Sequence, residues 1–163
     1  MGRQKVLIVD DDPDIREIVQ TNLEGAGYAV VGARDGAEGL RKVHEENPDL
    51  VILDVLMPEV DGWEVLRRIE RDPRKAGLPV IMLTCVSEDA EVLRGLQEGA
   101  LEYLTKPFHP ENVVASVRIL LDVFDEPALR QARRRQLIAR RQRLMGLPPE
   151  PVALGALSGT SHG

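Results

Sequence analysis

Short apolar segments alternate with longer amphipathic segments along the chain up to about residue 124. The apolar segments are mostly rich in Val, Ile and Leu, as expected for strands covered on both faces. They lie at 5–9, 28–32, 50–53, 79–83 and 101–104. Between them, apolar residues recur with helical spacing, as Ile15, Val19 and Leu23 do. Five such repeats predict an α/β fold, a doubly wound parallel sheet with helices on both faces.

The pattern changes after Phe124, and this change sets the expected domain organisation. Pro127 should end or bend the preceding helix, because proline cannot continue a helix without distortion. Residues 128–145 contain good helix formers without a breaker, whereas the remainder is rich in Gly, Pro and Ser. We therefore expect three parts: an α/β domain over 1–124, a basic helical extension over 125–145 and a disordered tail over 146–163.

Composition narrows the class of protein. The chain is 43% hydrophobic and 29% charged, which is typical of a soluble domain with its own core. Its single cysteine, Cys85, excludes an internal disulfide and a Cys-based zinc site. No apolar run approaches the roughly 20 residues that span a bilayer, and the N-terminus lacks a signal-peptide pattern. We expect a cytoplasmic location and no membrane partner.

Charged side chains are unevenly distributed. Residues 1–124 carry 14 Lys and Arg against 24 Asp and Glu, whereas 125–163 carry 7 Arg against 3 acids. The split predicts an acidic domain followed by a basic segment.

Polar residues stand where the predicted strands end, which is where ligands bind in an open α/β sheet. The acids are Asp10, Asp11 and Asp12 after the first strand and Asp54 after the third. Thr84 ends the fourth strand, and Lys106 follows the fifth. In the common strand order 2-1-3-4-5, these groups converge on one shallow cleft.

The three consecutive aspartates are expected to have different roles. Asp12 precedes Pro13, a favoured first helical residue, so Asp12 is interpreted as an N-cap. Asp10 and Asp11 come too early to cap well and should lie near Asp54. Three carboxylates so close together need a counter-ion, and Mg²⁺ is the natural one for oxygen ligands. In an alternative interpretation, Lys106 alone neutralises the three carboxylates. One positive charge cannot balance three negative charges, so this interpretation is disfavoured.

Four motifs in order resemble the receiver domain of bacterial two-component response regulators. They are VDDDPDI (9–15), LDVLMPEVDG (53–62), MLT (82–84) and YLTKPF (103–108). Each motif alone is weak, but their order on successive predicted strands is specific. The resemblance covers about residues 3–124 and implies a flavodoxin-like five-stranded sheet of order 2-1-3-4-5.

The resemblance implies a phosphoryl acceptor and a metal site. Asp54 would accept a phosphoryl group from a sensor histidine kinase or a histidine phosphotransfer protein. Asp10, Asp11, Asp54 and the backbone carbonyl of Leu56 would hold Mg²⁺. The domain would then catalyse its own phosphorylation and dephosphorylation, rather than act on a substrate as a classical enzyme does.

The resemblance also implies a conformational switch. Lys106 would pair with the phosphoryl oxygens, and the Lys106–Pro107 peptide bond would be cis. Thr84 would bind the phosphoryl group through its hydroxyl, and Tyr103 would change rotamer when Thr84 moves. This change would carry the signal to a downstream protein target.

Two apolar residues are expected to tune the lifetime of the phosphoryl group. Leu56 and Val86 occupy positions, two past Asp54 and two past Thr84, that lie beside the phosphoryl group in the family. Neither side chain can orient an attacking water. We expect a comparatively stable acyl phosphate, suited to slow output or to onward transfer as a phosphorelay intermediate.

Other functions remain to be weighed. Haloacid-dehalogenase-type phosphatases need an acid two residues after the nucleophile, where this chain has Leu56. The basic helix over 128–145 is interpreted first as a solvated extension or an interaction helix, which packs on a partner or in a homodimer. Binding of nucleic acid through this helix ranks second. Nucleic acid is not expected as a partner, because the segment has no base-stacking aromatic and the acidic domain repels a duplex.

Overall fold

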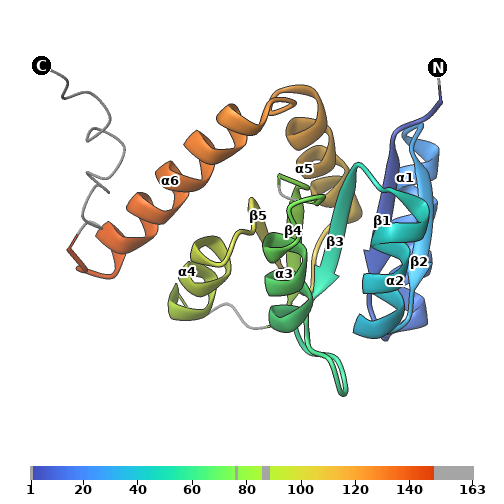
Figure 1. Cartoon of the computed structure of the whole chain (residues 1–163), viewed down its shortest axis with the longest axis horizontal. Coiled ribbons are helices and arrows are strands. Elements are labelled where there is room, and N and C mark those ends of the chain that lie inside the picture. The colour runs from blue at the N-terminus through green and yellow to red at the C-terminus, as the bar shows by residue number, and fades with distance from the viewer. Residues whose placement is uncertain (1, 76, 86–88, 149–163) are drawn as a thin grey trace, which may run out of the picture.

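Five parallel strands form one sheet of order β2-β1-β3-β4-β5 (Figure 1). The computed structural model describes residues 2–75, 77–85 and 89–148. The strands are β1 (Lys5–Val9), β2 (Ala29–Ala33), β3 (Leu50–Asp54), β4 (Val80–Thr84) and β5 (Glu102–Thr105). The predicted α/β fold class and its strand order are confirmed.

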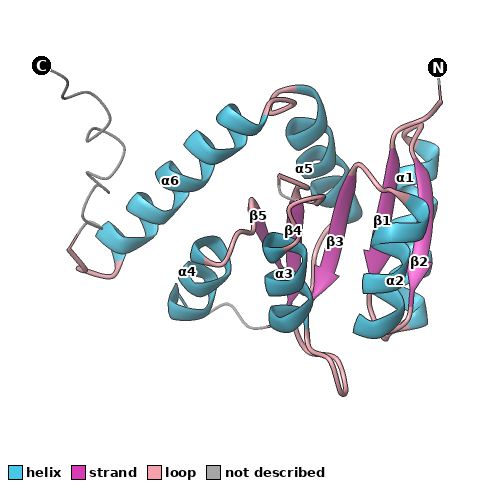
Figure 2. Cartoon of the chain, viewed as in Figure 1, coloured by secondary structure: helices cyan, strands magenta, loops and turns pink. Residues whose placement is uncertain are grey.

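Helices cover both faces of this sheet (Figure 2). They are α1 (Pro13–Gly25), α2 (Gly36–Glu46), α3 (Gly62–Arg71), α4 (Asp89–Gln97), α5 (Pro110–Asp122) and α6 (Pro127–Leu144). One hydrophobic cluster joins the sheet to α1 and α5, and a second joins it to α2 and α3. The molecule therefore has three layers, with α6 added after them.

Alternation along the strands separates the two clusters. Val6 and Ile8 of β1 point into the cluster with α1 and α5, whereas Leu7 and Val9 point into the other. All four side chains are fully buried. Successive residues of a strand face opposite sides of a sheet, so a continuous apolar run fills both cores.

Several strands extend one residue beyond the apolar runs that predicted them. β3 ends at Asp54, one residue past its apolar run, and β4 ends at Thr84, as predicted. Asp54 pairs with Leu83, and Thr84 pairs with Thr105, in the sheet register. Backbone pairing continues past the last apolar side chain, so polar residues become the final residues of strands.

The helix after α5 is not a free solvated extension. Pro127 is the first residue of α6, a position where the missing N–H of proline costs nothing. Figure 1 shows α6 running from the end of α5 back toward α4, and contacts between α4 and α6 confirm that they pack together. Of the expected tail over 146–163, residues 149–163 lie outside the described residues.

Trp63, at the start of α3, packs against α4. The guanidinium of Arg94 lies 4.6 Å from the centroid of the Trp63 ring. A Cβ added to Gly95 would lie 3.2 Å from the same ring, so the helices approach closely here. Trp63 is 6% exposed and packs in the core. Among the described helices, none is long and apolar enough to cross a membrane.

Candidate functional site

Three carboxylates meet at the ends of β1 and β3. Asp10 directly follows β1 and is fully buried, whereas Asp54 ends β3 and is 3% exposed. Asp11 is exposed at the rim. One carboxylate oxygen from each residue lies within 4.8 Å of the other two. The strand order therefore brings together the three acids that the sequence singled out.

Lys106 places its ammonium between the two buried acids. Its Nζ lies 2.8 Å from Asp10 Oδ2 and 3.4 Å from Asp54 Oδ1. The Lys106 amide donates to the carbonyl of Thr84 at 2.6 Å, and the Lys106–Pro107 peptide bond is cis. The residues after β5 thus continue alongside β4 and direct the lysine across the sheet edge.

Backbone contacts fix the orientation of Asp10. Its Oδ1 accepts a hydrogen bond from the amide of Asp12 at 2.9 Å, and its carbonyl accepts one from Arg16 Nη1 at 2.6 Å. The role of Arg16 was not predicted, because an arginine on the first helix has no motif that marks it. Asp12 caps α1 by accepting from the amide of Asp14 at 2.9 Å, which confirms its N-cap role.

Burial dominates the electrostatics of the acceptor position. Burial, with the neighbouring charge of Asp10, raises the pKa of Asp54 from 3.8 to about 7, although Lys106 opposes this rise. Burial lowers the pKa of Lys106, but Asp10 and Asp54 more than offset this, so its net pKa is raised. The site therefore has a surplus of negative charge that one lysine does not balance.

The donor set fits a hard divalent cation. Carboxylate oxygens are the ligands that Mg²⁺ and Ca²⁺ take in proteins. Within the described part of the chain, Asp10 Oδ2 receives no well-directed hydrogen bond, although it forms the ion pair with Lys106. An incompletely satisfied buried oxygen, beside Asp11 and Asp54, suits coordination of a cation.

The loop after β3 needs a glycine at its end. A Cβ on Gly62 would collide with the carbonyl oxygen of Asp54 and would lie 2.8 Å from Val55 Cα. The Gly62 amide also donates to the carbonyl of Val55 at 2.9 Å. This close approach folds the loop back onto the acceptor strand, and the side chain of Leu56 is left 56% exposed beside the site.

Thr84 connects the site to Tyr103. Thr84 is fully buried at the end of β4, and Tyr103 lies half-buried on the neighbouring strand β5. Burial raises the pKa of Tyr103, and a side-chain hydrogen bond with Thr84 partly opposes this rise. The two predicted switch residues are therefore in direct contact. Val86, the second residue expected to tune lifetime, lies outside the described residues.

Comparison with known proteins identifies the class that this fold and site define. The sequence model of the response regulator receiver domain matches residues 6–118. The chain therefore belongs to the response regulator receiver domain family.

Curated relatives of this chain include transcriptional regulators of bacteria. The DNA-binding dual master transcriptional regulator RpaA of Synechocystis sp. is 46% identical over 117 residues, covering 72% of this chain and 48% of that protein. The alkaline phosphatase synthesis transcriptional regulatory protein PhoP of Bacillus subtilis is 43% identical over 118 residues, with the same coverage of 72% and 48%. The chain spans about half the length of these curated relatives.

A solved structure shows the same fold over nearly its whole length. The chemotaxis protein CheY4 of Vibrio cholerae matches with a TM-score of 0.68 and 35% sequence identity. The match covers 72% of this chain and 98% of CheY4.

Proposed function

We propose that this chain accepts a phosphoryl group on Asp54 from a phosphohistidine of a sensor kinase or of a histidine phosphotransfer protein. The observation that carries the proposal is the ion-paired cluster, in which Lys106 contacts both Asp10 and Asp54 beside the exposed Asp11. Membership of the receiver family supports the same reaction.

The reaction is a transfer between two acceptors. A carboxylate oxygen of Asp54 attacks phosphorus, the N–P bond of the phosphohistidine breaks, and its electron pair returns to the imidazole nitrogen, which takes a proton from solvent. The product is an acyl phosphate on Asp54. Such transfer depends on positioning and on neutralising the charge that spreads over the phosphoryl oxygens.

Different residues of the site would provide the positioning and the neutralisation of charge. Lys106 Nζ, already 3.4 Å from Asp54 Oδ1, would pair with a phosphoryl oxygen. Asp10, Asp11 and Asp54, with the Leu56 carbonyl, would hold Mg²⁺. When bound, the cation supplies positive charge that favours ionised Asp54 and neutralises the phosphoryl oxygens. Thr84 would bind the phosphoryl group through its hydroxyl, so that Tyr103 senses the product.

Intact-protein mass spectrometry tests the proposal directly. The chain is incubated with acetyl phosphate and Mg²⁺, and we expect a mass increment of one phosphoryl group. Asp54→Asn should abolish the increment, as should removal of Mg²⁺ by EDTA. Asp12→Asn is the matched control, since this exposed N-cap keeps its capping oxygen and should be labelled as the natural chain is. Labelling of Asp54→Asn to the same extent would refute the assignment.

A second candidate function is binding of nucleic acid. The relative RpaA is a DNA-binding regulator by name, and Arg135, Arg140 and Arg143 of α6 are exposed to solvent. The expectation that nucleic acid is not a partner therefore finds no support among the relatives. Contacts to phosphates would make binding weaken steeply with salt. Titration of labelled duplex DNA at two salt concentrations, with Arg140→Gln/Arg143→Gln as the variant, tests this candidate.

A further inference from the structure

Two arginines fix α6 onto the domain through its first turns. Arg130 donates to the carbonyls of Phe124 at 2.6 Å, Gly77 at 2.8 Å and Asp125 at 3.2 Å. Arg133 pairs with Glu102 of β5, with Nη2 2.6 Å from Oε2, and donates from Nε to the carbonyl of Leu101 at 3.2 Å. The helix is thus attached to the edge strand β5 and to the turn before β4.

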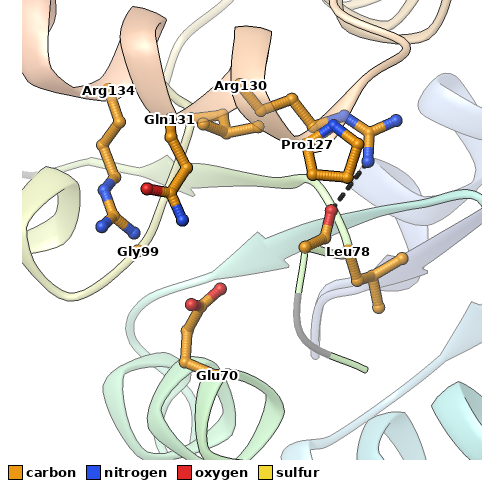
Figure 3. Close-up of a pocket in the computed structure, with 9 residues that line it drawn as sticks. Glu70, Leu78, Gly99, Pro127, Arg130, Gln131 and Arg134 are labelled. Atoms are coloured by element: carbon orange, nitrogen blue, oxygen red, sulfur yellow. Dashed lines mark hydrogen bonds between the residues drawn. The ribbon is translucent and has the colours of Figure 1, made fainter. Parts of the chain in front are cut away.

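The attachment is polar and incompletely packed. Figure 3 shows Gln131 and Arg134 pointing from α6 toward Glu70 of α3 across a cavity of about 200 Å³. In the described part of α6, the only buried side chain is that of Gln142, and Leu144 is 66% exposed. Burial of apolar area supplies most of the free energy of helix docking. A helix that buries so little of it should dock reversibly.

α4 depends on α6 for much of its packing. Val92, Leu93 and Leu96 are buried, yet they belong to neither of the two hydrophobic clusters of the described chain. The contacts of α4 with α6 are more extensive than those with β5. The α4–β5 face, formed by Val92 and Leu96 with the residues of β5, is therefore held partly by α6.

Tyr103 joins this face to the phosphorylation site. A second cavity, of about 370 Å³, separates the face from the later turns of α6. It is lined by Val92, Leu96, Glu102, Tyr103, Leu137, Arg140, Arg141 and Leu144. Tyr103 thus borders α6 on one side and contacts the Thr84 side chain on the other. If the Thr84 hydroxyl bound a phosphoryl group on Asp54, it would leave its contact with Tyr103, and the lining of this cavity would change.

We propose that α6 is an intramolecular strap over the α4–β5 face, docked in the unmodified chain and released when Asp54 is phosphorylated. The proposal rests on the proposed function of Asp54. Because two linked equilibria influence each other equally, release of the strap must in turn favour the phosphorylated state. Modification of Asp54 would thereby expose both α4 and the inner face of α6.

Amide hydrogen exchange, followed by mass spectrometry, measures release of the strap. The chain is compared in Mg²⁺ alone and in Mg²⁺ with beryllofluoride, which mimics the phosphoryl group. We expect α6 to exchange about fivefold faster or more with beryllofluoride, since coupling of this kind is typically 5-fold to 150-fold. Peptides from α1 should be unchanged. Equal or slower exchange of α6, with beryllofluoride bound, would overturn the strap.

The reciprocal experiment measures the affinity for beryllofluoride when the strap is loosened. Arg133→Gln and, separately, Glu102→Gln each remove the ion pair that holds α6 to β5. We expect each variant to bind beryllofluoride about threefold more tightly. The effect is small because a partly exposed ion pair contributes only modestly to docking of α6. Arg135→Gln is the matched control, two residues further along the helix, exposed and without an ion pair among the described residues. Its affinity should match that of the natural chain.

The outcomes separate the two proposals. If acetyl phosphate leaves the mass unchanged and beryllofluoride does not bind, the proposed function of Asp54 fails. If phosphorylation proceeds normally but the Arg133 and Glu102 variants bind beryllofluoride as the control does, the strap alone is refuted.

Discussion

Replacing Asp54 by Asn should stabilise the cation-free protein, and the gain should grow with pH. Burial raises the pKa of Asp54 from 3.8 to about 7, so the folded chain holds this proton more tightly than the unfolded chain does. The stability that the protonated carboxyl contributes is fully present below the unfolded pKa of 3.8 and is lost as pH rises through about 7. Asn stays neutral throughout and does not incur this loss.

The magnitude follows from the same pKa. A rise from 3.8 to about 7 costs the folded state on the order of 4 kcal/mol once Asp54 is ionised, since each pKa unit is worth about 1.4 kcal/mol. Less than half of this cost is present at about pH 5. The free energy of unfolding of Asp54→Asn minus that of the natural chain should therefore increase by on the order of 3 kcal/mol between about pH 5 and about pH 8.5.

Urea denaturation in EDTA, at both pH values, measures this difference. Titrations of groups remote from Asp54 cancel, because the two chains share them. Asp12→Asn serves as the control, since it removes an exposed charge and keeps the cap of α1, and its difference should not vary with pH. Saturating Mg²⁺ should shrink the advantage of Asp54→Asn, because the cation binds the ionised acid only in the natural chain.

One result would refute the reasoning. If the advantage of Asp54→Asn is constant across this pH range, or declines toward high pH, then Asp54 is ionised without cost and Lys106 alone balances it.

Three further predictions concern single side chains of the same edge of the sheet. Asp12→Ala should lower the free energy of unfolding by about 1 kcal/mol through the lost cap, while labelling by acetyl phosphate persists; an unchanged urea midpoint would argue against the cap. Lys106→Met should abolish labelling and destabilise the chain by about 3 kcal/mol at neutral pH, because Asp10 loses its partner; a labelled variant would show that the lysine is dispensable. Leu56→Asn should shorten the lifetime of the acyl phosphate, followed as decay of the phosphorylated mass in Mg²⁺, and an unaltered decay would exclude this side chain from control of hydrolysis.

The sheet and the site were predictable because local patterns encode them. The apolar run at 50–53 implies a strand buried on both faces, and parallel strands bring Asp10 and Asp54 to one edge. The ammonium of Lys106 was then expected beside these carboxylates, at the same edge of the sheet. The strands continue one residue past the apolar runs at 50–53 and 79–83, because backbone pairing includes Asp54 and Thr84.

The packing of α6 could not be predicted in the same way. Its apolar residues are too sparse to define a face, and its docking relies on arginines that pair with carbonyls and with Glu102. Such contacts join residues far apart in the sequence and leave no periodic pattern. Arg16, which donates to the carbonyl of Asp10, escaped prediction because no motif marks it, although the two residues are close in the sequence.

The contact between α3 and α4 gives the protein an intrinsic fluorescence reporter. Trp63 is the only tryptophan in the chain, so its emission arises from one place in the fold. Its ring lies under the guanidinium of Arg94 and against Gly95, both on α4. Indole emission depends on nearby charge and on contact with water, and a displacement of α4 alters both. Fluorescence of the unlabelled chain in a stopped-flow instrument can therefore follow the movement of α4 in real time.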